Sequence, residues 1–229
     1  MVIKDICCVV PSYNEGRTIG RIVKKLKEHN FTVYAVDDGS TDETAAIAES
    51  EGAVVVKNAK NMGKGAALRA GFKRALDDGF ELILIMDGDD QHDVADIAHL
   101  IKKMRETSAG IVIGNRMLDT GMMPRIRIIT NRFMSYMLSL LSGQYVPDTQ
   151  CGFRLVSREV LNKIKLECSK YEIESEMIIK AARAGFKIES VPIKTVYQDE
   201  ISKINPFVDT LRFMRLLLKT AVAGRAGRS

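Results

Sequence analysis

Two aspartates that stand two residues apart follow an apolar run near the middle of the chain. Asp87 and Asp89 come after Leu-Ile-Leu-Ile-Met, and Gln91 lies two residues further on. Carboxylates are costly to hold beside apolar side chains unless a positive charge offsets them. Two carboxylates and an amide oxygen suit a hard cation such as Mg2+ or Mn2+, which is often shared with substrate phosphates. The spacing therefore indicates a metal–diphosphate site, with one alternative, an acidic helix start in which Asp90 and Asp93 favour the helix dipole.

Polar segments also follow the first two apolar runs. After the first run, Tyr13 can stack on a nucleotide base while Glu15 bonds the base edge, or the segment caps a helix and exposes the ring. After the second, Asp37 or Asp38 can accept a hydrogen bond from a base N–H or a ribose hydroxyl, whereas Asp42 serves a helix N-terminus. Taken alone, each segment fits the structural role better than the nucleotide site.

A lysine between two glycines, Gly63-Lys64-Gly65, opens a predicted helix. The segment lacks the third glycine of the dinucleotide fingerprint and the spacing of a Walker loop. Lys64 can still approach a phosphate at a helix N-terminus. A plain glycine turn is an equally good interpretation.

Short apolar runs alternate with helical patterns over the first half of the chain. Strands are expected at 6–10, 33–36, 54–56, 82–86 and 111–113, and helices at 19–26, 45–48, 66–76 and 97–104. This alternation predicts right-handed β-α-β units and a mostly parallel sheet covered on both faces. Ligands of such sheets bind beyond the carboxyl ends of the strands, where the polar segments are expected to converge.

The second half is less regular. Helices are expected at 125–141, 158–163 and 174–184, strands at 188–191 and 194–197, an irregular stretch at 148–154, and a final helix after Pro206. Gly79, Gly110 and Gly185 stand where helices should end.

Composition fits one sizeable globular domain, since 46% of the 229 residues are hydrophobic and no linker or repeat divides them. The net charge of +5 lies mostly after residue 206, where five basic side chains stand against Asp209 alone. That distribution argues against a nucleic-acid-binding surface and favours contact between the tail and an anionic membrane. With no signal peptide visible, we expect a cytoplasmic protein with four reduced cysteines.

The motifs together resemble those of family 2 glycosyltransferases of the GT-A fold, in the same order along the chain. The segments that carry the resemblance are Val9–Glu15, Val36–Asp42, Asn61–Gly65 and Met86–Asp89. The later segments Gly114–Arg116, Asp148–Arg154 and Ser202-Lys203 resemble the polyprenyl-phosphate branch, typified by dolichol-phosphate mannosyltransferase. The resemblance covers nearly the whole chain. It implies an α/β nucleotide-diphospho-sugar transferase fold with a mostly parallel, Rossmann-like central sheet and helices on both faces.

The resemblance also implies a role for particular residues. The nucleotide-sugar site is expected to comprise Pro11, Tyr13, Asn14, Glu15, Asp37, Asp38, Lys64, Gly65, Asp87 and Gly88. Asp87, Asp89 and Gln91 match metal and diphosphate ligands. Arg116 and Lys203 match basic residues that face the donor diphosphate or the acceptor phosphate, and with Asp89 they form the expected catalytic set. Arg127 and Arg132 are further candidates for holding the acceptor phosphate.

The implied reaction is inverting, metal-dependent transfer of a hexose from a GDP- or UDP-linked donor to a polyprenyl (dolichyl) phosphate. A phosphate monoester is already a dianion near neutral pH, so it needs no general base. Asp148 and Glu176 are base candidates only if the acceptor is an alcohol. One departure leaves mannose in doubt: the Arg and Gly that precede Ser-Lys in the mannosyltransferase pattern are missing before Ser202-Lys203. The alternatives are a soluble hydroxyl acceptor, a sugar nucleotidyltransferase that releases pyrophosphate, and a non-catalytic nucleotide-sugar binder.

The expected boundary separates a catalytic domain, residues 1–205, from a basic amphipathic helix and tail, residues 206–229. One face of that helix carries Arg212, Arg215 and Lys219, and another carries Phe207, Leu211, Met214, Leu218 and Ala221. This pattern is typical of an interfacial helix on the cytoplasmic membrane face, and a core-packed helix with an exposed basic face is the alternative. The same two interpretations stay open for the stripe Phe133, Met134, Met137, Leu138 and Leu141.

Overall fold

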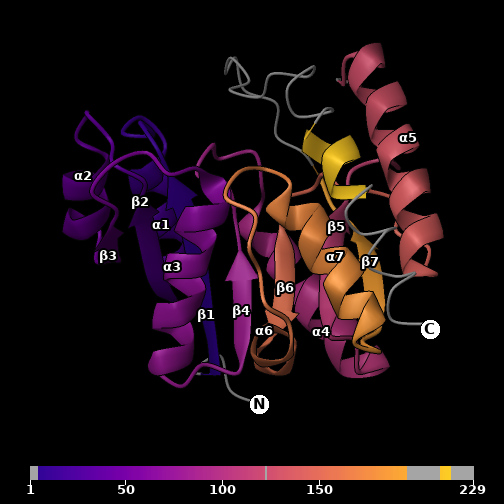
Figure 1. The fold of residues 1–229 in the computed structure, drawn as a ribbon. Helices are drawn as coiled ribbons and strands as arrows, with labels where there is room; N and C mark the ends of the chain where they lie inside the picture. Colours follow the sequence, from indigo (N-terminus) through magenta and orange to yellow (C-terminus); the bar gives the residue numbers. More distant parts are fainter. Residues whose placement is uncertain (1–4, 122, 195–211, 218–229) are drawn as a thin grey trace.

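The computed structural model describes residues 5–121, 123–194 and 212–217, which form one seven-stranded sheet flanked by helices (Figure 1). The strands are β1 (Ile6–Ser12), β2 (Thr32–Asp37), β3 (Val54–Lys57), β4 (Leu82–Ile85), β5 (Ile111–Asn115), β6 (Arg154–Ser157) and β7 (Ile188–Pro192). The helices are α1 (Ile19–Glu28), α2 (Thr44–Ser50), α3 (Lys64–Asp77), the 3-10 turn η2 (Val94–Asp96), α4 (Ile97–Thr107), α5 (Arg125–Ser142), α6 (Arg158–Lys163) and α7 (Ile173–Arg183). The strand order is β3-β2-β1-β4-β6-β5-β7.

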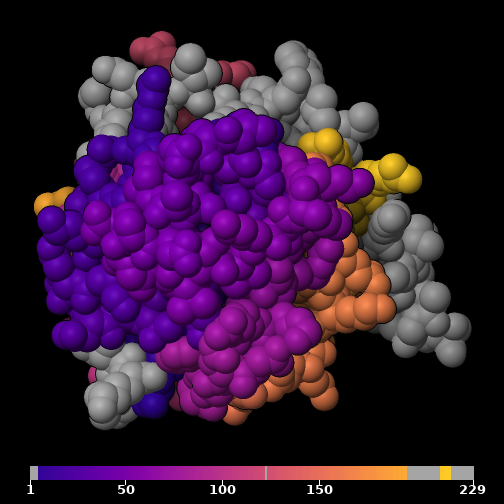
Figure 2. Space-filling view, turned by 90° about the vertical axis from the view of Figure 1, so that its left-hand side faces the viewer, coloured from indigo at the N-terminus to yellow at the C-terminus, as the bar shows by residue number. Residues whose placement is uncertain are grey.

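The parallel half of the sheet confirms the prediction of β-α-β units. β1 pairs in parallel with β2 and β4, and Ser12 lies beside Asp37 at the carboxyl ends of β1 and β2. Cys7 and Cys8 point to opposite faces and both are fully buried, so both faces of the sheet are covered. Figure 1 shows α3 and α7 in front of the sheet and α4 behind it. The view from the β3 edge shows that the N-terminal half of the chain, indigo to purple, forms most of that side (Figure 2).

One strand was not expected. β6 begins at the last residue of the stretch predicted to be irregular, continues through residues for which no element was predicted, and runs antiparallel to both β4 and β5. Its first residue is Arg154, a charged side chain that hides the short apolar pair after it from a hydrophobicity pattern. Because Arg154 pairs with Ile85 at the carboxyl end of β4, residues 148–153 are brought to the edge where the polar segments gather.

Two of the three predicted glycine stops are confirmed. Gly79 follows α3 and Gly185 follows α7, both with positive φ. The third prediction was wrong, because Ser108 takes the left-handed conformation at the end of α4 (φ 51°). Gly110 serves packing instead, since a Cβ there would lie 2.7 Å from the Val160 side chain. Of the predicted strand 194–197, Lys194 is outside any strand and the rest lies outside the described residues.

The stripe on α5 proves to be mainly core. Met134 and Leu138 are buried in a small cluster with Ile179 of α7, whereas Phe133 is 51% exposed. The described part of the tail, residues 212–217, is helical and adds Phe213 and Leu217 to the same cluster.

The core-packed interpretation therefore holds for these six tail residues. Met214, expected on the apolar face, is 37% exposed, and Arg215 is exposed as predicted. The predicted position of the apolar face was wrong by about one residue, because the buried side chains are those of Phe213 and Leu217. Arg212, expected on the basic face, is half-buried, and the remaining tail residues named above, with Lys203, lie outside the described residues. No helix in the described part of the chain has the length and apolar character needed to span a bilayer.

Candidate active site

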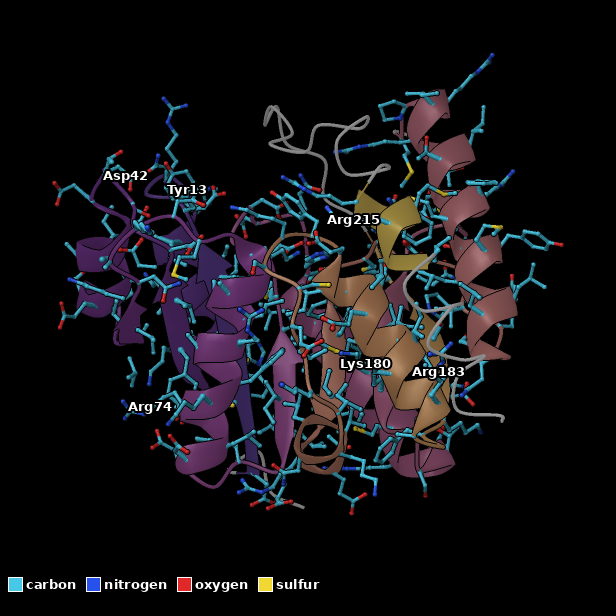
Figure 3. The ribbon with its side chains drawn as sticks, in the orientation of Figure 1. Tyr13, Asp42, Arg74, Lys180, Arg183 and Arg215 are labelled. Carbon is cyan, nitrogen blue, oxygen red and sulfur yellow. The ribbon has the colours of Figure 1, made fainter. Side chains whose placement is uncertain are left out.

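The loops after β1 and β2 form one hydrogen-bonded unit at the carboxyl edge of the sheet. The backbone N–H of Asn14 donates to Ser40 Oγ at 2.9 Å, and Asn14 Oδ1 accepts from the backbone N–H of Thr41 at 2.8 Å. Asn14 has φ 52°, a left-handed conformation that asparagine tolerates better than most residues. Figure 3 shows Tyr13 and Asp42 together at this edge, with Arg74 of α3 toward the opposite end. The structure therefore brings together the two segments expected to hold the nucleotide.

The remaining residues of these loops are placed as follows. Pro11 is buried, and Tyr13 and Glu15 are half-buried. The Glu15 backbone N–H donates to Thr44 Oγ1 at 2.8 Å. Asp42 accepts from the backbone N–H of Thr44 at 3.1 Å, which agrees with its predicted service to the N-terminus of α2.

The two adjacent aspartates after β2 have different partners. Asp37 Oδ1 accepts from the backbone N–H of Ser40 at 3.0 Å, which closes a turn. Asp38 is 3% exposed and accepts from Asn58 Nδ2 at 2.8 Å and from the backbone N–H groups of Met62 and Gly63 at 3.0 and 2.6 Å. Asp38 therefore anchors the loop that leads into Lys64.

Replacing Asp38 by alanine should destabilise this loop. The buried Gly63 N–H loses its acceptor, and an unsatisfied buried donor costs about 1–3 kcal/mol. We expect the free energy of unfolding in urea to fall by about that amount. Asp77→Ala, an exposed carboxylate at the far end of α3, should leave stability unchanged. Equal stability of the Asp38 variant and the native chain would contradict the anchoring role.

Lys64 is the first residue of α3 and joins two carboxylates. Its Nζ lies 2.6 Å from Asp87 Oδ1 and 2.7 Å from Glu174 Oε1. Burial alone would lower the pKa of Lys64, but the two carboxylates raise it overall. Burial would likewise raise the pKa of Asp87, but the Lys64 ammonium brings it below its usual range. Both groups are therefore charged at neutral pH.

Glycines allow these groups to approach closely. A Cβ on Gly152 would overlap the Asp87 carboxylate, and one on Gly65 would overlap the carbonyl oxygen of Cys168. The N–H groups of Gly65 and Ala66 donate to the Ser169 carbonyl at 2.9 and 3.2 Å. These glycines therefore have packing roles, and the start of α3 is fixed against residues 168–169.

The acidic stretch after β4 contains groups with different roles. Asp89 Oδ1 accepts from the Gln91 backbone N–H at 3.2 Å, and the Gly88 carbonyl accepts from Thr18 Oγ1 at 2.5 Å. Asp93 caps the η2 turn through the Ala95 N–H, as the helix-start alternative predicts. That alternative is wrong for Asp90, a buried residue with φ 55° whose carboxylate pairs with Arg21 and Lys25 at 3.1 Å each.

His92 was missed by the sequence analysis. The residue is 4% exposed, and its ring stacks on Phe153 with the centroids 5.0 Å apart. Its Nδ1 has no hydrogen-bond partner among the described residues. Burial lowers the pKa of His92 to about 4, with opposing effects from the nearby charges, so the ring is neutral at pH 7. A histidine within the acidic stretch was the only sequence signal for it.

Arg116 is held by a buried carboxylate. Its Nε and Nη2 donate to Asp148 at 2.8 and 3.0 Å, and Asp148 also accepts from Asn131 of α5 at 2.7 Å. Burial would raise the pKa of Asp148, but Arg116 and Asn131 lower it overall. Ile85 of β4 and Ile113 of β5 both pair with Arg154 of β6, so Arg116 follows β5 at the same edge of the sheet at which Asp87 follows β4. The structure therefore places Arg116 near the predicted metal ligands.

Arg127 and Arg132, the further candidates for holding the acceptor phosphate, lie on α5 and are exposed.

Arg154 and Glu174 were also missed as members of the site. The fully buried Arg154 guanidinium donates to the carbonyls of Thr149 and Cys151, each at 2.7 Å, and to that of Glu174 at 2.8 Å. Arg154 therefore fixes the loop that contains Gly152. The sequence signal for Arg154 was a charge at the head of an apolar run, and that for Glu174 was Glu174-Ser175-Glu176 at a helix start. Neither signal predicts which residue the side chain contacts.

The predicted metal ligands fit a hard cation in their chemistry. Asp87, Asp89 and Gln91 supply only oxygen donors, and the Lys64 ammonium beside Asp87 shows that positive charge is stabilised there. Within the described ranges, no three His, Cys, Asp or Glu side chains are arranged to hold a metal. Because Lys64 Nζ lies 2.6 Å from Asp87 Oδ1, a cation that binds this oxygen competes with the ammonium for it.

Comparison with known proteins finds relatives that cover most of the chain. The chain is 37% identical over 201 residues to an uncharacterised protein of Methanocaldococcus jannaschii, with 85% of this chain and 83% of that protein covered. It is 32% identical over 222 residues to the UDP-N-acetylglucosamine–dolichyl-phosphate N-acetylglucosaminyltransferase of Methanococcus voltae, covering 87% of this chain and 88% of the relative.

The fold is also that of a solved enzyme. Glucosyl-3-phosphoglycerate synthase of Mycobacterium tuberculosis, crystallised with Mn2+, UDP and glucosyl-3-phosphoglycerate, superimposes with a TM-score of 0.70. The identity is 20%, with 95% of this chain and 78% of that chain covered. This likeness supports the predicted GT-A fold. The model of glycosyl transferase family 2 matches residues 7–165, most of the described sheet. The chain is therefore a glycosyltransferase of family 2.

Proposed function

We propose that this enzyme transfers a hexose, with inversion at the anomeric carbon, from a nucleotide sugar to a polyprenyl phosphate. The observation that carries the proposal is the Lys64–Asp87 ion pair at the carboxyl edge of the sheet, where Arg116 also follows β5. This edge offers two cations for phosphate oxygens and a carboxylate for a divalent metal. The Methanococcus voltae relative, whose name states a dolichyl-phosphate acceptor, supports the choice of acceptor.

The reaction exchanges one C–O bond for another. An oxygen of the acceptor phosphate bonds to the anomeric carbon, and the bond from that carbon to the donor diphosphate breaks. The leaving nucleoside diphosphate keeps the electron pair, and Lys64 and Arg116 are placed to stabilise its growing negative charge. A divalent ion held by Asp87, Asp89 and Gln91 would supply Lewis-acid stabilisation of the same charge.

The two base candidates both have other partners. Asp148 is held between Arg116 and Asn131. Glu176 accepts from the backbone N–H groups of Glu167 and Cys168 and pairs with Lys180 at 2.7 Å. Neither carboxylate is poised to deprotonate an alcohol. This favours a phosphate dianion as the acceptor, because a dianion needs no general base.

The function is tested with nucleotide sugars, polyprenyl phosphate, and Mn2+ or Mg2+. UDP-linked sugars come first in the panel because of the relative's donor, followed by GDP-linked sugars. We expect a lipid-linked sugar phosphate and free nucleoside diphosphate. Release of pyrophosphate would instead indicate a nucleotidyltransferase, and no lipid product from any donor would refute the proposed acceptor.

We also propose that α5 contacts the cytoplasmic face of the membrane. Its exposed apolar side chains recur every three or four residues along one face, and each is 51–70% exposed: Ile126, Ile129, Phe133, Tyr136 and Leu140. Arg125, Arg127 and Arg132 on the same helix are exposed and suit anionic lipid headgroups. Asn131 of this helix bonds to Asp148, the partner of Arg116, which would place the active site near a lipid acceptor.

Replacing Ile129 and Phe133 together by serine should weaken binding to anionic vesicles at least about tenfold, because burial of such a side chain contributes about 1.5–3 kcal/mol. Co-sedimentation with vesicles measures the effect. Tyr145→Ser, which removes an exposed apolar side chain outside α5, is the control and should bind as the native chain does. If the double variant sediments like the control, α5 is not the contact surface.

A further inference from the structure

We infer that Lys64 is an exchangeable internal counter-ion, which releases Asp87 to a divalent cation while it stays paired with Glu174. The inference rests on the proposed function, because it assigns the metal to Asp87. It adds a positioning residue, Glu174, to which neither the sequence motifs nor the comparisons give a role. When the cation binds, the ion pair between Lys64 and Asp87 would open, and the ion pair between Lys64 and Glu174 would remain.

The exposure of the three side chains indicates which ion pair opens. The Asp87 side chain is 25% exposed, whereas those of Lys64 and Glu174 are only 12% and 9% exposed. A cation arriving from solvent therefore reaches the Asp87 carboxylate first. The ion pair between Lys64 and Glu174 lies deeper and is better protected from water.

The two carboxylates are fixed and the ammonium is the movable member. Gly152 packs directly against the Asp87 carboxylate. Glu174 lies at the start of α7, where Arg154 binds its carbonyl oxygen at 2.8 Å and lies 3.6 Å from its carboxylate. Lys64 has a backbone held at the start of α3, but its four-carbon side chain can move the ammonium by rotation. Exchange thus requires only a change of side-chain rotamer.

Glu174 keeps the free-energy cost of this exchange low. A buried charge that loses its only partner is strongly destabilising. When Asp87 changes partner, the Lys64 ammonium keeps the Glu174 carboxylate at 2.7 Å, so no unpaired cation is left in the interior. The released side of the ammonium is then available to an anionic group such as a diphosphate oxygen. A permanent Asp87–Lys64–Glu174 triad would instead keep an ammonium 2.6 Å from Asp87 Oδ1, in competition with the cation.

Mn2+ binding to the full chain, followed by the EPR signal of free Mn2+ without donor or acceptor, tests the exchange. Lys64→Met keeps the length of the side chain but removes the competing ammonium, so Mn2+ affinity should rise at least about tenfold. Glu174→Gln should weaken Mn2+ binding at least about tenfold, because the displaced lysine loses its remaining carboxylate. In the Lys64→Met background, Glu174→Gln should have almost no effect.

This double-mutant comparison separates exchange from the general effect of charge. If the negative charge of Glu174 simply attracts the metal through space, Glu174→Gln weakens binding equally in both backgrounds, and the inference is wrong. It is also wrong if Lys64→Met leaves Mn2+ affinity unchanged or lower. Lys25→Met is the matched control, since Lys25 pairs with Asp90 rather than a predicted ligand. An equal gain in that variant would refute the specific role of Lys64.

Failure here leaves the proposed function testable by itself. A chain that forms the lipid product but shows no coupling between Lys64 and Glu174 keeps the function and loses the exchange. A chain that shows the coupling but makes no lipid product keeps the exchange and loses the proposed acceptor.

Discussion

Asp87→Asn is expected to lower kcat/KM for sugar transfer by about 10²- to 10³-fold, as removal of one group that stabilises transition-state charge typically does. The asparagine has nearly the same shape, so its amide oxygen still accepts from Lys64 beside Gly152. The negative charge needed to hold a divalent cation is lost. The loss should therefore appear in turnover and, separately, in Mn2+ binding measured without substrate.

The variant needs a control that separates loss of activity from loss of folding. Circular dichroism and the urea midpoint show whether Asp87→Asn remains folded, and Asp77→Asn provides an exposed aspartate outside the site. Turnover within a few-fold of the native enzyme would remove Asp87 from the predicted ligands.

Asp148→Asn should produce the largest loss of stability among the variants considered. Asp148 is 1% exposed and makes two hydrogen bonds to the Arg116 side chain and one to Asn131. Breaking one side of a buried ion pair costs about 3–5 kcal/mol, since the other charge stays buried without compensation. Chemical denaturation measures the loss. Lys73→Ala, which breaks an exposed pair on α3, should change little.

The same variant should affect the chemical step more than acceptor binding. Arg116 loses one of the two oxygens that orient its guanidinium, and we expect kcat to fall more than KM for polyprenyl phosphate rises. A raised KM with unchanged kcat would assign Arg116 to the acceptor phosphate instead of the leaving diphosphate.

The stabilisation from Asp148 should also depend on pH in a defined direction. The pKa of Asp148 in the folded chain lies below its ordinary value of 3.8. The folded state therefore favours the ionised form, and the stabilisation is complete above the ordinary pKa. It is lost as pH falls from about 4 through the folded pKa. The stability difference between native chain and Asp148→Asn should shrink over that range, and growth of the difference would contradict the assignment.

The sequence was sufficient where the signal is local. Continuous apolar runs predicted the buried parallel strands, and the polar residues directly after them predicted where the carboxyl edge of the sheet lies. Both features are written in neighbouring residues, because a strand buried on both faces must be apolar throughout. The same reasoning failed for β6, where Arg154 begins the strand. That charge is tolerated because backbone carbonyls accept from its guanidinium, those of Thr149 and Cys151 shortly before it and that of Glu174 twenty residues after it.

The tertiary structure alone decided which charges meet. Lys64 pairs with Glu174, which is far along the chain, and Arg116 pairs with Asp148, from which the whole of α5 separates it in the sequence. No spacing rule predicts such contacts, since they depend on how β6 returns through the sheet. The structure likewise separated the core residues of α5 from its exposed face. By itself, then, the sequence determined the α/β fold and the acidic strand end at Asp87, through local patterns of polarity. The partners of that acidic end depend on long-range packing, which only the folded chain supplies.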